Sequence, residues 1–154
     1  MENSKKQLGE ILIEKRLITP EQLTGALEEQ TRTKEFLGVI LIKKGYIKEK
    51  DLLTALSSQF RIPLVSLKDK YIDWNFVKQF SSSLIVDCKC FPVAKDEWSA
   101  TFAIVNPLDL KGLEKAEQEA RGCRIKMVLV SQGDMEDVIE RYRQYIRANI
   151  MKLF

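Results

Sequence analysis

The chain has 154 residues, 45% of them hydrophobic, and a formal net charge of +3, so it can bury the core of one ordinary domain or of two small lobes. No apolar run approaches the roughly 20 residues of a membrane-spanning helix, and the opening MENSKKQ lacks the apolar segment of a secretory signal, so we expect a cytoplasmic protein. A charge of +3 is too small to indicate a nucleic-acid partner, and we expect none.

The cysteine and histidine content restricts the chemistry further. Cys88, Cys90 and Cys123 are odd in number in a chain without an export signal, which favours reduced thiols over disulfides. With no histidine present, three thiolates do not complete a tetrahedral zinc site, and we expect no metal ion. The seven glycines form no phosphate-binding loop, and histidine-based triads are excluded. We therefore expect no catalytic residues and no enzymatic activity.

The first predicted elements come from an internal repeat. Residues 7–30 and 36–59 agree at eleven of 24 positions at an offset of 29, where residue frequencies give roughly one or two by chance. The identical pairs are Leu8/Leu37, Gly9/Gly38, Ile11/Ile40, Leu12/Leu41, Ile13/Ile42, Lys15/Lys44, Ile18/Ile47, Leu23/Leu52, Ala26/Ala55, Leu27/Leu56 and Gln30/Gln59. Each copy is typical of a short helix, a tight turn and a second helix.

The second helix of each copy has an apolar stripe. In the first copy, Thr19, Pro20 and Gln22 predict its start through an N-cap and a capping box. The stripe residues recur at i, i+3, i+4 and i+7 and end in a glutamine, as Leu23, Ala26, Leu27 and Gln30 and again as Leu52, Ala55, Leu56 and Gln59. Neither copy can bury its stripe alone, so we predict a four-helix lobe of two stacked helical hairpins.

The glycines of the repeat raise two questions. Gly45 falls where the first helix of copy two should end, a position that often needs a left-handed backbone. Copy one has Arg16 there. Either Arg16 adopts that conformation at a cost of about 1 kcal/mol, or the loop of copy one has a different shape. Gly9 and Gly38, near helix starts, cost up to about 1 kcal/mol each relative to alanine. This shared cost indicates close approach of the backbone to another helix or to a ligand.

Basic residues are concentrated in the first half of the chain. Residues 1–70 contain 13 Lys and Arg against 10 Asp and Glu, while the remainder is balanced. Residues 32–50 contain six bases, Arg32, Lys34, Lys43, Lys44, Lys48 and Lys50, against Glu35 and Glu49. This surplus is either a solvated face or a docking surface for an anionic ligand or an acidic partner.

The second half predicts mixed structure. Residues 72–84 favour a short helix, and residues 89–96 and 97–106 alternate as two strands of a hairpin. A helix is expected from about Asp109 to Arg121-Gly122, then a third strand over residues 123–131. The last helix begins at Ser131 to Asp134 and is amphipathic and basic toward its end. It either packs on the sheet and frays or binds a partner or a membrane surface.

The double motif resembles the N-terminal regulatory domain, of the MshEN or GSPII_E_N type, of bacterial type II secretion and type IV pilus assembly ATPases. The resemblance continues through FRIPLVSL at residues 60–67, FAIVNPLDLKGLEKAEQ at 102–118 and SQGDMEDVIERY at 131–142. It implies docking to the membrane platform of the machine and, in some members, binding of cyclic-di-GMP along the tandem motif. In ligand-binding members each motif opens with Arg-Leu-Gly, whereas this chain has Gln7 and Phe36 in place of the arginines.

These observations predict an α+β fold, with a helical lobe over residues 1–66 and a small α/β lobe of about three strands over residues 67–154. We expect a non-catalytic docking domain that binds a platform protein and reaches the membrane only through partners, with an ATPase domain as a further partner C-terminal in the same chain. The alternative is a cyclic-di-GMP sensor, with that nucleotide as a regulatory ligand and no other cofactor. Its candidate ligand-binding residues are Gln7, Leu8, Gly9, Gln30, Phe36, Leu37, Gly38 and Gln59.

Overall fold

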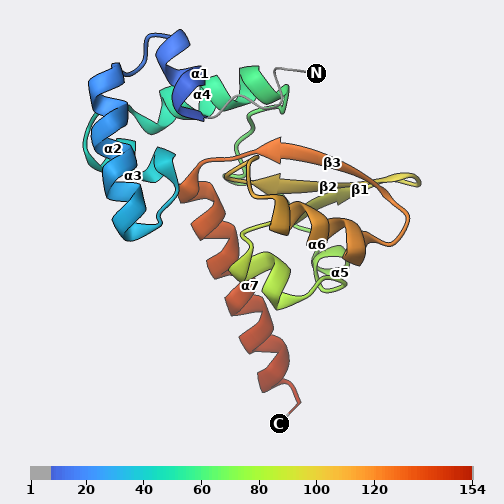
Figure 1. Ribbon diagram of the computed structural model, residues 1–154. Helices are drawn as coiled ribbons and strands as arrows, with labels where there is room; N and C mark the ends of the chain where they lie inside the picture. Colours follow the sequence, from blue (N-terminus) through green and yellow to red (C-terminus); the bar gives the residue numbers. More distant parts are fainter. Residues whose placement is uncertain (1–7, 154) are drawn as a thin grey trace. The chain divides into compact units, whose positions relative to one another are not determined.

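The computed structural model describes residues 8–153 and divides the chain into two compact units, Met1–Arg61 and Ile62–Phe154. The first unit contains helices alone among its described residues, and the second combines helices with a three-stranded sheet. This confirms the predicted α+β class, with helices first and a small strand-containing region after them (Figure 1). The two units are described separately below.

The first unit consists of α1 (Leu8–Glu14), α2 (Pro20–Thr33), α3 (Leu37–Lys43) and α4 (Glu49–Phe60). Helix α1 packs on α4, α3 packs on α2, and α1 also contacts α3. In the repeat, α1 corresponds to α3 and α2 corresponds to α4. The contact of α1 with α4 is therefore equivalent to that of α3 with α2, and the two hairpins pack reciprocally. The predicted four-helix arrangement is confirmed. Its core contains Leu8, Ile11, Leu12, Ile18, Ala26, Leu37, Ile40, Leu41, Ile47, Leu52, Leu53, Ala55 and Leu56.

The same turn follows the first helix of both copies. Arg16 has φ = 58° and Gly45 has φ = 75°, so both lie in the left-handed region. In copy one, the Leu17 amide donates to the Leu12 carbonyl at 2.9 Å and the Arg16 amide donates to the Ile13 carbonyl at 2.9 Å. Copy two repeats this pair of bonds, from Tyr46 to Leu41 and from Gly45 to Ile42, each at 3.0 Å. Each turn is therefore a Schellman motif, and Arg16 retains it despite its side chain.

The second helices begin differently in the two copies. The Thr19 hydroxyl accepts a hydrogen bond from the Gln22 amide at 3.1 Å, and the Thr19 amide donates to Gln22 Oε1 at 3.0 Å. This is the predicted capping box, with Pro20 in the first turn. Lys48 takes the N-cap position of α4 with an extended backbone but no side-chain cap bond. Copy two therefore lacks the cap that copy one has.

The sheet of the second unit has the order β1-β2-β3, with β1 (Phe91–Lys95) antiparallel to β2 (Ser99–Ile104) and β3 (Arg124–Leu129) parallel to β2. The parallel step is made through α6 (Leu110–Ala120), which contacts β3. An extended segment adds one bridge to the end of β3, where the Leu129 amide donates to Pro63 and the Val65 amide donates to Leu129. The three predicted strands are all present.

The segment predicted as one short helix over residues 72–84 is different in the structure. It contains a single helical turn, α5 (Trp74–Val77), and a separate π-helical turn, η2 (Ser83–Asp87). Asp73 caps the first turn by accepting from the amides of Asn75 and Phe76. Between the turns, Ser81 donates from its amide and its hydroxyl to the Glu119 carboxylate of α6 at 2.7 and 2.6 Å. This tertiary contact interrupts the helix, and local sequence gives no indication of it.

The last helix, α7 (Gln132–Met151), is attached to its own unit along its first two thirds. It begins within the predicted range of residues 131–134, and the Ser131 hydroxyl caps it by accepting from the Asp134 amide. The Asp134 carboxylate in turn accepts from the Leu67 amide at 2.8 Å and from the Ser66 hydroxyl at 3.1 Å. Tyr142 shares a 2.7 Å hydrogen bond with Ser82. Across residues 8–153, no helix is both apolar enough and long enough to cross a membrane.

Candidate functional site

The structure places the candidate residues at the starts and ends of the two motifs. Gln7 lies outside the described residues. Leu8 and Leu37 are 3% and 7% exposed, and both are core residues of the first unit. Gly9 and Gly38 are buried beside them in the first turns of α1 and α3. The apolar part of each motif start therefore has a structural role that does not require a ligand.

The two motif glycines allow close packing within each hairpin. A Cβ atom placed on Gly9 would lie 2.5 Å from Leu23 Cδ1, and one placed on Gly38 would lie 2.8 Å from Leu52 Cδ2. Leu23 and Leu52 are equivalent residues of α2 and α4. Because real Cβ contacts are longer than this, the second helix of each copy occupies the space that a side chain would need. Of the two explanations left open by the sequence, approach of another helix accounts for these glycines.

Phe36 covers the start of the second motif. It lies at the N-cap position of α3 with an extended backbone and is half-buried. Its ring atom Cε1 would lie 2.9 Å from a Cβ atom on Gly38, so the ring lies directly over this glycine. An arginine at this position would bring a guanidinium to the same place, whereas Phe36 brings an uncharged ring. The second motif can offer stacking here but no charge.

The two motif glutamines are in different situations. Gln30 is half-buried and donates from Nε2 to the Glu35 carbonyl at 3.0 Å, which joins the end of α2 to the segment that leads into α3. Gln59 is also half-buried, and its side chain forms no hydrogen bond with any residue between 8 and 153. The amide of Gln30 therefore closes the linker, while that of Gln59 is available to a ligand or a partner.

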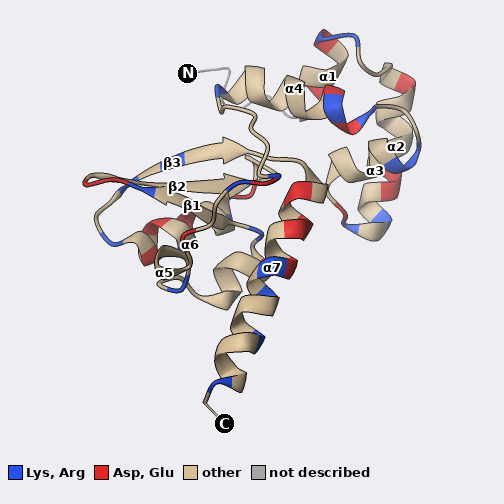
Figure 2. Cartoon of the chain, turned by 180° about the vertical axis from the view of Figure 1, so that it is seen from behind, with Lys and Arg blue, Asp and Glu red and all other residues tan. Residues whose placement is uncertain are grey.

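Two of the six bases in residues 32–50 are neutralised locally. Lys43 pairs with Glu35 at 3.0 Å, and Lys44 pairs with Glu29 at 3.0 Å. The hydrogen bond and the charge of Glu29 raise the pKa of Lys44 above its usual value. Arg32, Lys34, Lys48 and Lys50 form no ion pair among the residues that the structure describes, and all four are exposed. Figure 2 shows these bases on the first unit together with acidic residues, several of which are exposed as well.

The repeat is asymmetric on one face of its second helices, which the sequence did not reveal. Leu27 of α2 is 41% exposed, whereas the identical residue Leu56 of α4 is 0% exposed. Its neighbours on the helix face, Thr24 and Thr31, are exposed as well. Their counterparts in copy two are apolar. This difference between the copies is the sequence signal that could have indicated the asymmetry. We call Thr24, Leu27 and Thr31 the α2 face.

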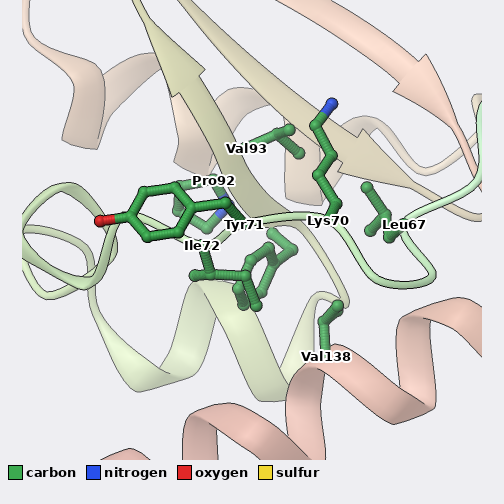
Figure 3. Close-up of a pocket in the computed structure, with 8 residues that line it drawn as sticks. Leu67, Lys70, Tyr71, Ile72, Pro92, Val93 and Val138 are labelled. Atoms are coloured by element: carbon green, nitrogen blue, oxygen red, sulfur yellow. The ribbon is translucent and has the colours of Figure 1, made fainter.

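Two cavities of the second unit differ in size and lining. A pocket among Leu67, Lys70, Tyr71, Ile72, Phe91, Pro92, Val93 and Val138 has a volume of only about 10 Å³. Figure 3 shows the Lys70 ammonium and the Tyr71 hydroxyl directed away from it. This is about the space of one water molecule. A larger hollow of about 700 Å³ is lined by three bases, three acids and Tyr71, so its charges cancel. Within residues 8–153, no group of three metal-binding side chains lies together.

Comparison with known proteins identifies the family. The model of the MshEN domain matches residues 60–149, which is more than half of the chain and begins where the repeat ends. A solved structure of MshE with cyclic-di-GMP superposes with a TM-score of 0.80 and 25% identity, over 90% of this chain and 99% of that one. A comparison with curated proteins found no match.

Two structures of the N-terminal domain of XpsE are similar to the chain as well. They superpose with TM-scores of 0.67 and 0.57, at 19% and 20% identity. The aligned regions cover 87% and 86% of this chain and 92% and 91% of those domains. At this identity they support the fold alone. The chain belongs to the MshEN domain family, the N-terminal regulatory domains of bacterial type II secretion and type IV pilus assembly ATPases.

Proposed function

We propose that this domain docks an assembly ATPase onto a platform protein of its machine on the cytoplasmic side of the membrane, and that the α2 face is the docking surface. The observation that carries this proposal is the exposure of Leu27 at a position where the other copy buries an identical leucine. A partner that covers Leu27 would remove its apolar surface from water, which favours binding.

The polar groups beside Leu27 also favour an apolar contact. The hydroxyl of Thr24 donates to the Pro20 carbonyl, and that of Thr31 donates to the Leu27 carbonyl, each at 3.0 Å. Because these hydroxyl protons are already bonded within the helix, a partner would not leave them unsatisfied when it covers the face. The exposed bases Arg32, Lys34, Lys48 and Lys50 belong to the same unit. They would attract an acidic segment and speed its association.

The test is the affinity of the full chain for the cytoplasmic part of the platform protein, measured by titration calorimetry. Leu27→Glu should weaken binding by about tenfold or more, since loss of a central apolar contact typically costs more than 1 kcal/mol. Leu110→Glu is the matched control, because Leu110 is 66% exposed but belongs to α6 of the other unit. Unchanged affinity of Leu27→Glu, with normal folding, would remove the α2 face from the proposal.

The second candidate function is sensing of cyclic-di-GMP through the tandem motif. Its support is the similarity to MshE, whose structure was solved with this nucleotide, over nearly the whole of both chains. Phe36 can stack on a base and Gln59 has an available amide, whereas Gln7 and Phe36 lack the charge of arginine. The candidate ligand residues remain Gln7, Leu8, Gly9, Gln30, Phe36, Leu37, Gly38 and Gln59.

Titration of the chain with cyclic-di-GMP at tens of micromolar concentrations tests this candidate. Binding heat that is lost in Phe36→Ala and Gln59→Ala would support the tandem motif as the site. No heat from the unchanged chain, but measurable heat from Gln7→Arg combined with Phe36→Arg, would mean that this domain has lost a site that the motif retains. Absence of heat from both proteins would reject nucleotide sensing.

A further inference from the structure

The C-terminal part of α7 combines exposed apolar side chains with positive charge. The helix is divided by charge along its length, as Figure 2 shows: its first nine residues contain Asp134, Glu136, Asp137 and Glu140 and no base. The residues from 141 onward contain Arg141, Arg143, Arg147 and Lys152 and no acid. The helix dipole favours negative charge near a helix start and positive charge near its end, but it acts only within the terminal turns. It does not account for bases as far back as Arg141.

The buried residues of α7 precede this end: they are Met135, Val138, Ile139 and Tyr142. Tyr145 stacks on Trp74 with a centroid distance of 4.7 Å and an interplanar angle of 7°. Beyond it, the helix continues to Met151 and extends away from the sheet (Figure 1). Ile150, Met151 and Leu153 are 49%, 74% and 81% exposed. The second unit therefore buries little of the surface of these apolar side chains.

Four residues of this end share one face. Arg143, Arg147, Ile150 and Met151 follow one another at i, i+4, i+7 and i+8, and so lie on one side of the helix. Arg143 makes a 3.9 Å ion pair with Glu140 in which both side chains are half exposed, an interaction of little strength. The face thus offers two guanidinium groups beside two large apolar side chains. We call these four residues the α7 face.

We propose that the α7 face binds directly to the surface of an anionic lipid bilayer. Guanidinium groups pair with lipid phosphates, and the neighbouring apolar side chains enter the boundary between headgroups and acyl chains. The two guanidinium groups and the two apolar side chains lie together on one exposed side of the helix, which matches a bilayer surface that presents phosphates above an apolar layer. The membrane contact is then direct, in addition to any contact made through protein partners.

Vesicle co-sedimentation of the full chain tests the proposal. Vesicles of phosphatidylethanolamine with about one third phosphatidylglycerol should bind the chain at low salt, and pure phosphatidylcholine vesicles should bind it weakly. Each base near an anionic surface contributes about a fivefold change in partitioning, so Arg143→Gln with Arg147→Gln should weaken binding roughly 25-fold. Ile150→Ser with Met151→Ser should weaken it severalfold as well, because the apolar side chains are replaced. All four residues are on the exposed end of the helix, so folding should be unaffected.

The matched control is Lys68→Gln with Lys70→Gln, which removes two exposed bases from the same unit at a distance along the chain from the α7 face. This control should bind vesicles nearly as well as the unchanged chain. Failure of the unchanged chain to bind anionic vesicles at low salt would overturn the proposal. Binding that the lysine control loses and the α7 variants keep would overturn it too, because another surface would then be responsible.

Discussion

Gly9 and Leu23 are packed so closely that a Cβ atom on the glycine would lie 2.5 Å from Leu23 Cδ1, and Gly38 and Leu52 repeat the arrangement at 2.8 Å in the second copy. Both pairs join the first helix of a hairpin to the second. The Leu-Gly pair that begins each motif is therefore part of the hairpin's own packing. Any ligand of the tandem motif would bind to a surface whose glycines are already covered from this side.

We predict that Gly9→Ala lowers the free energy of unfolding of the first unit by about 1 kcal/mol. Overpacking costs about 1–3 kcal/mol, which exceeds the gain of about 0.5–1 kcal/mol from replacing a helical glycine by alanine. The flexible end of Leu23 can move, which limits the loss. Urea unfolding followed by circular dichroism measures the change.

Gly25→Ala is the control for this substitution. A Cβ atom on Gly25, within α2, would meet nothing within 4 Å, so only the gain in helix propensity remains and the protein should become more stable. The double variant Gly9→Ala with Leu23→Ala should lose less stability than the sum of the losses in the two single variants, since the second change relieves the contact. Equal effects of Gly9→Ala and Gly25→Ala would contradict the packing explanation.

Arg16→Gly should raise the free energy of unfolding by about 1 kcal/mol. Arg16 has φ = 58° in the same Schellman turn that Gly45 forms in copy two, and a left-handed conformation costs an L-residue roughly this amount. The reciprocal change Gly45→Arg should lower stability by a similar amount, because it imposes the same conformation on a side chain. Thermal unfolding of the two variants should therefore shift in opposite directions, and a shift in the same direction would refute the equivalence of the turns.

The starts of α2 and α4 allow a paired test of capping. Thr19→Ala should cost about 1 kcal/mol, because the amide of Gln22 loses its acceptor. Lys48→Ser should add up to about 1 kcal/mol, since the backbone at Lys48 is already extended as an N-cap requires and has no side-chain cap bond. Denaturant midpoints at constant slope measure both changes. A loss of stability in Lys48→Ser would show that the lysine has a role other than capping.

Cys90 should make stability depend on alkaline pH. Burial, followed by the nearby Cys88, Asp109 and Glu119, raises the pKa of its thiol from 9.0 to about 12. Between these two values the unfolded chain has lost the proton and the folded chain keeps it, so the folded state binds more protons and stability falls as pH rises. Cys90→Ala should reduce this decline between about pH 9 and 12, measured by urea unfolding at several pH values. Parallel pH profiles of the two proteins would contradict this origin.

Much of the fold was predictable because its elements are set by local patterns. The capping box of Thr19 and Gln22, the serine cap of α7 and the alternation of the strands all depend on residues close together in sequence. The repeat predicted four helices, because two apolar stripes of the same spacing can cover each other. The interruption between α5 and η2 was missed because it depends on Glu119 of α6, which is 38 residues from Ser81.

For the candidate site, the sequence determines which residues are present but not what each of them contacts. Sequence alone determined that the 24-residue motif is duplicated, that Gln7 and Phe36 replace two arginines, and that the chain resembles the MshEN domains. Only the tertiary structure decided that Gly9 and Gly38 pack against leucines, that Arg16 keeps the left-handed turn, and that Leu27 is exposed while Leu56 is buried. The physical reason is that identical residues acquire their roles from what lies against them, and these neighbours are set by how the helices pack.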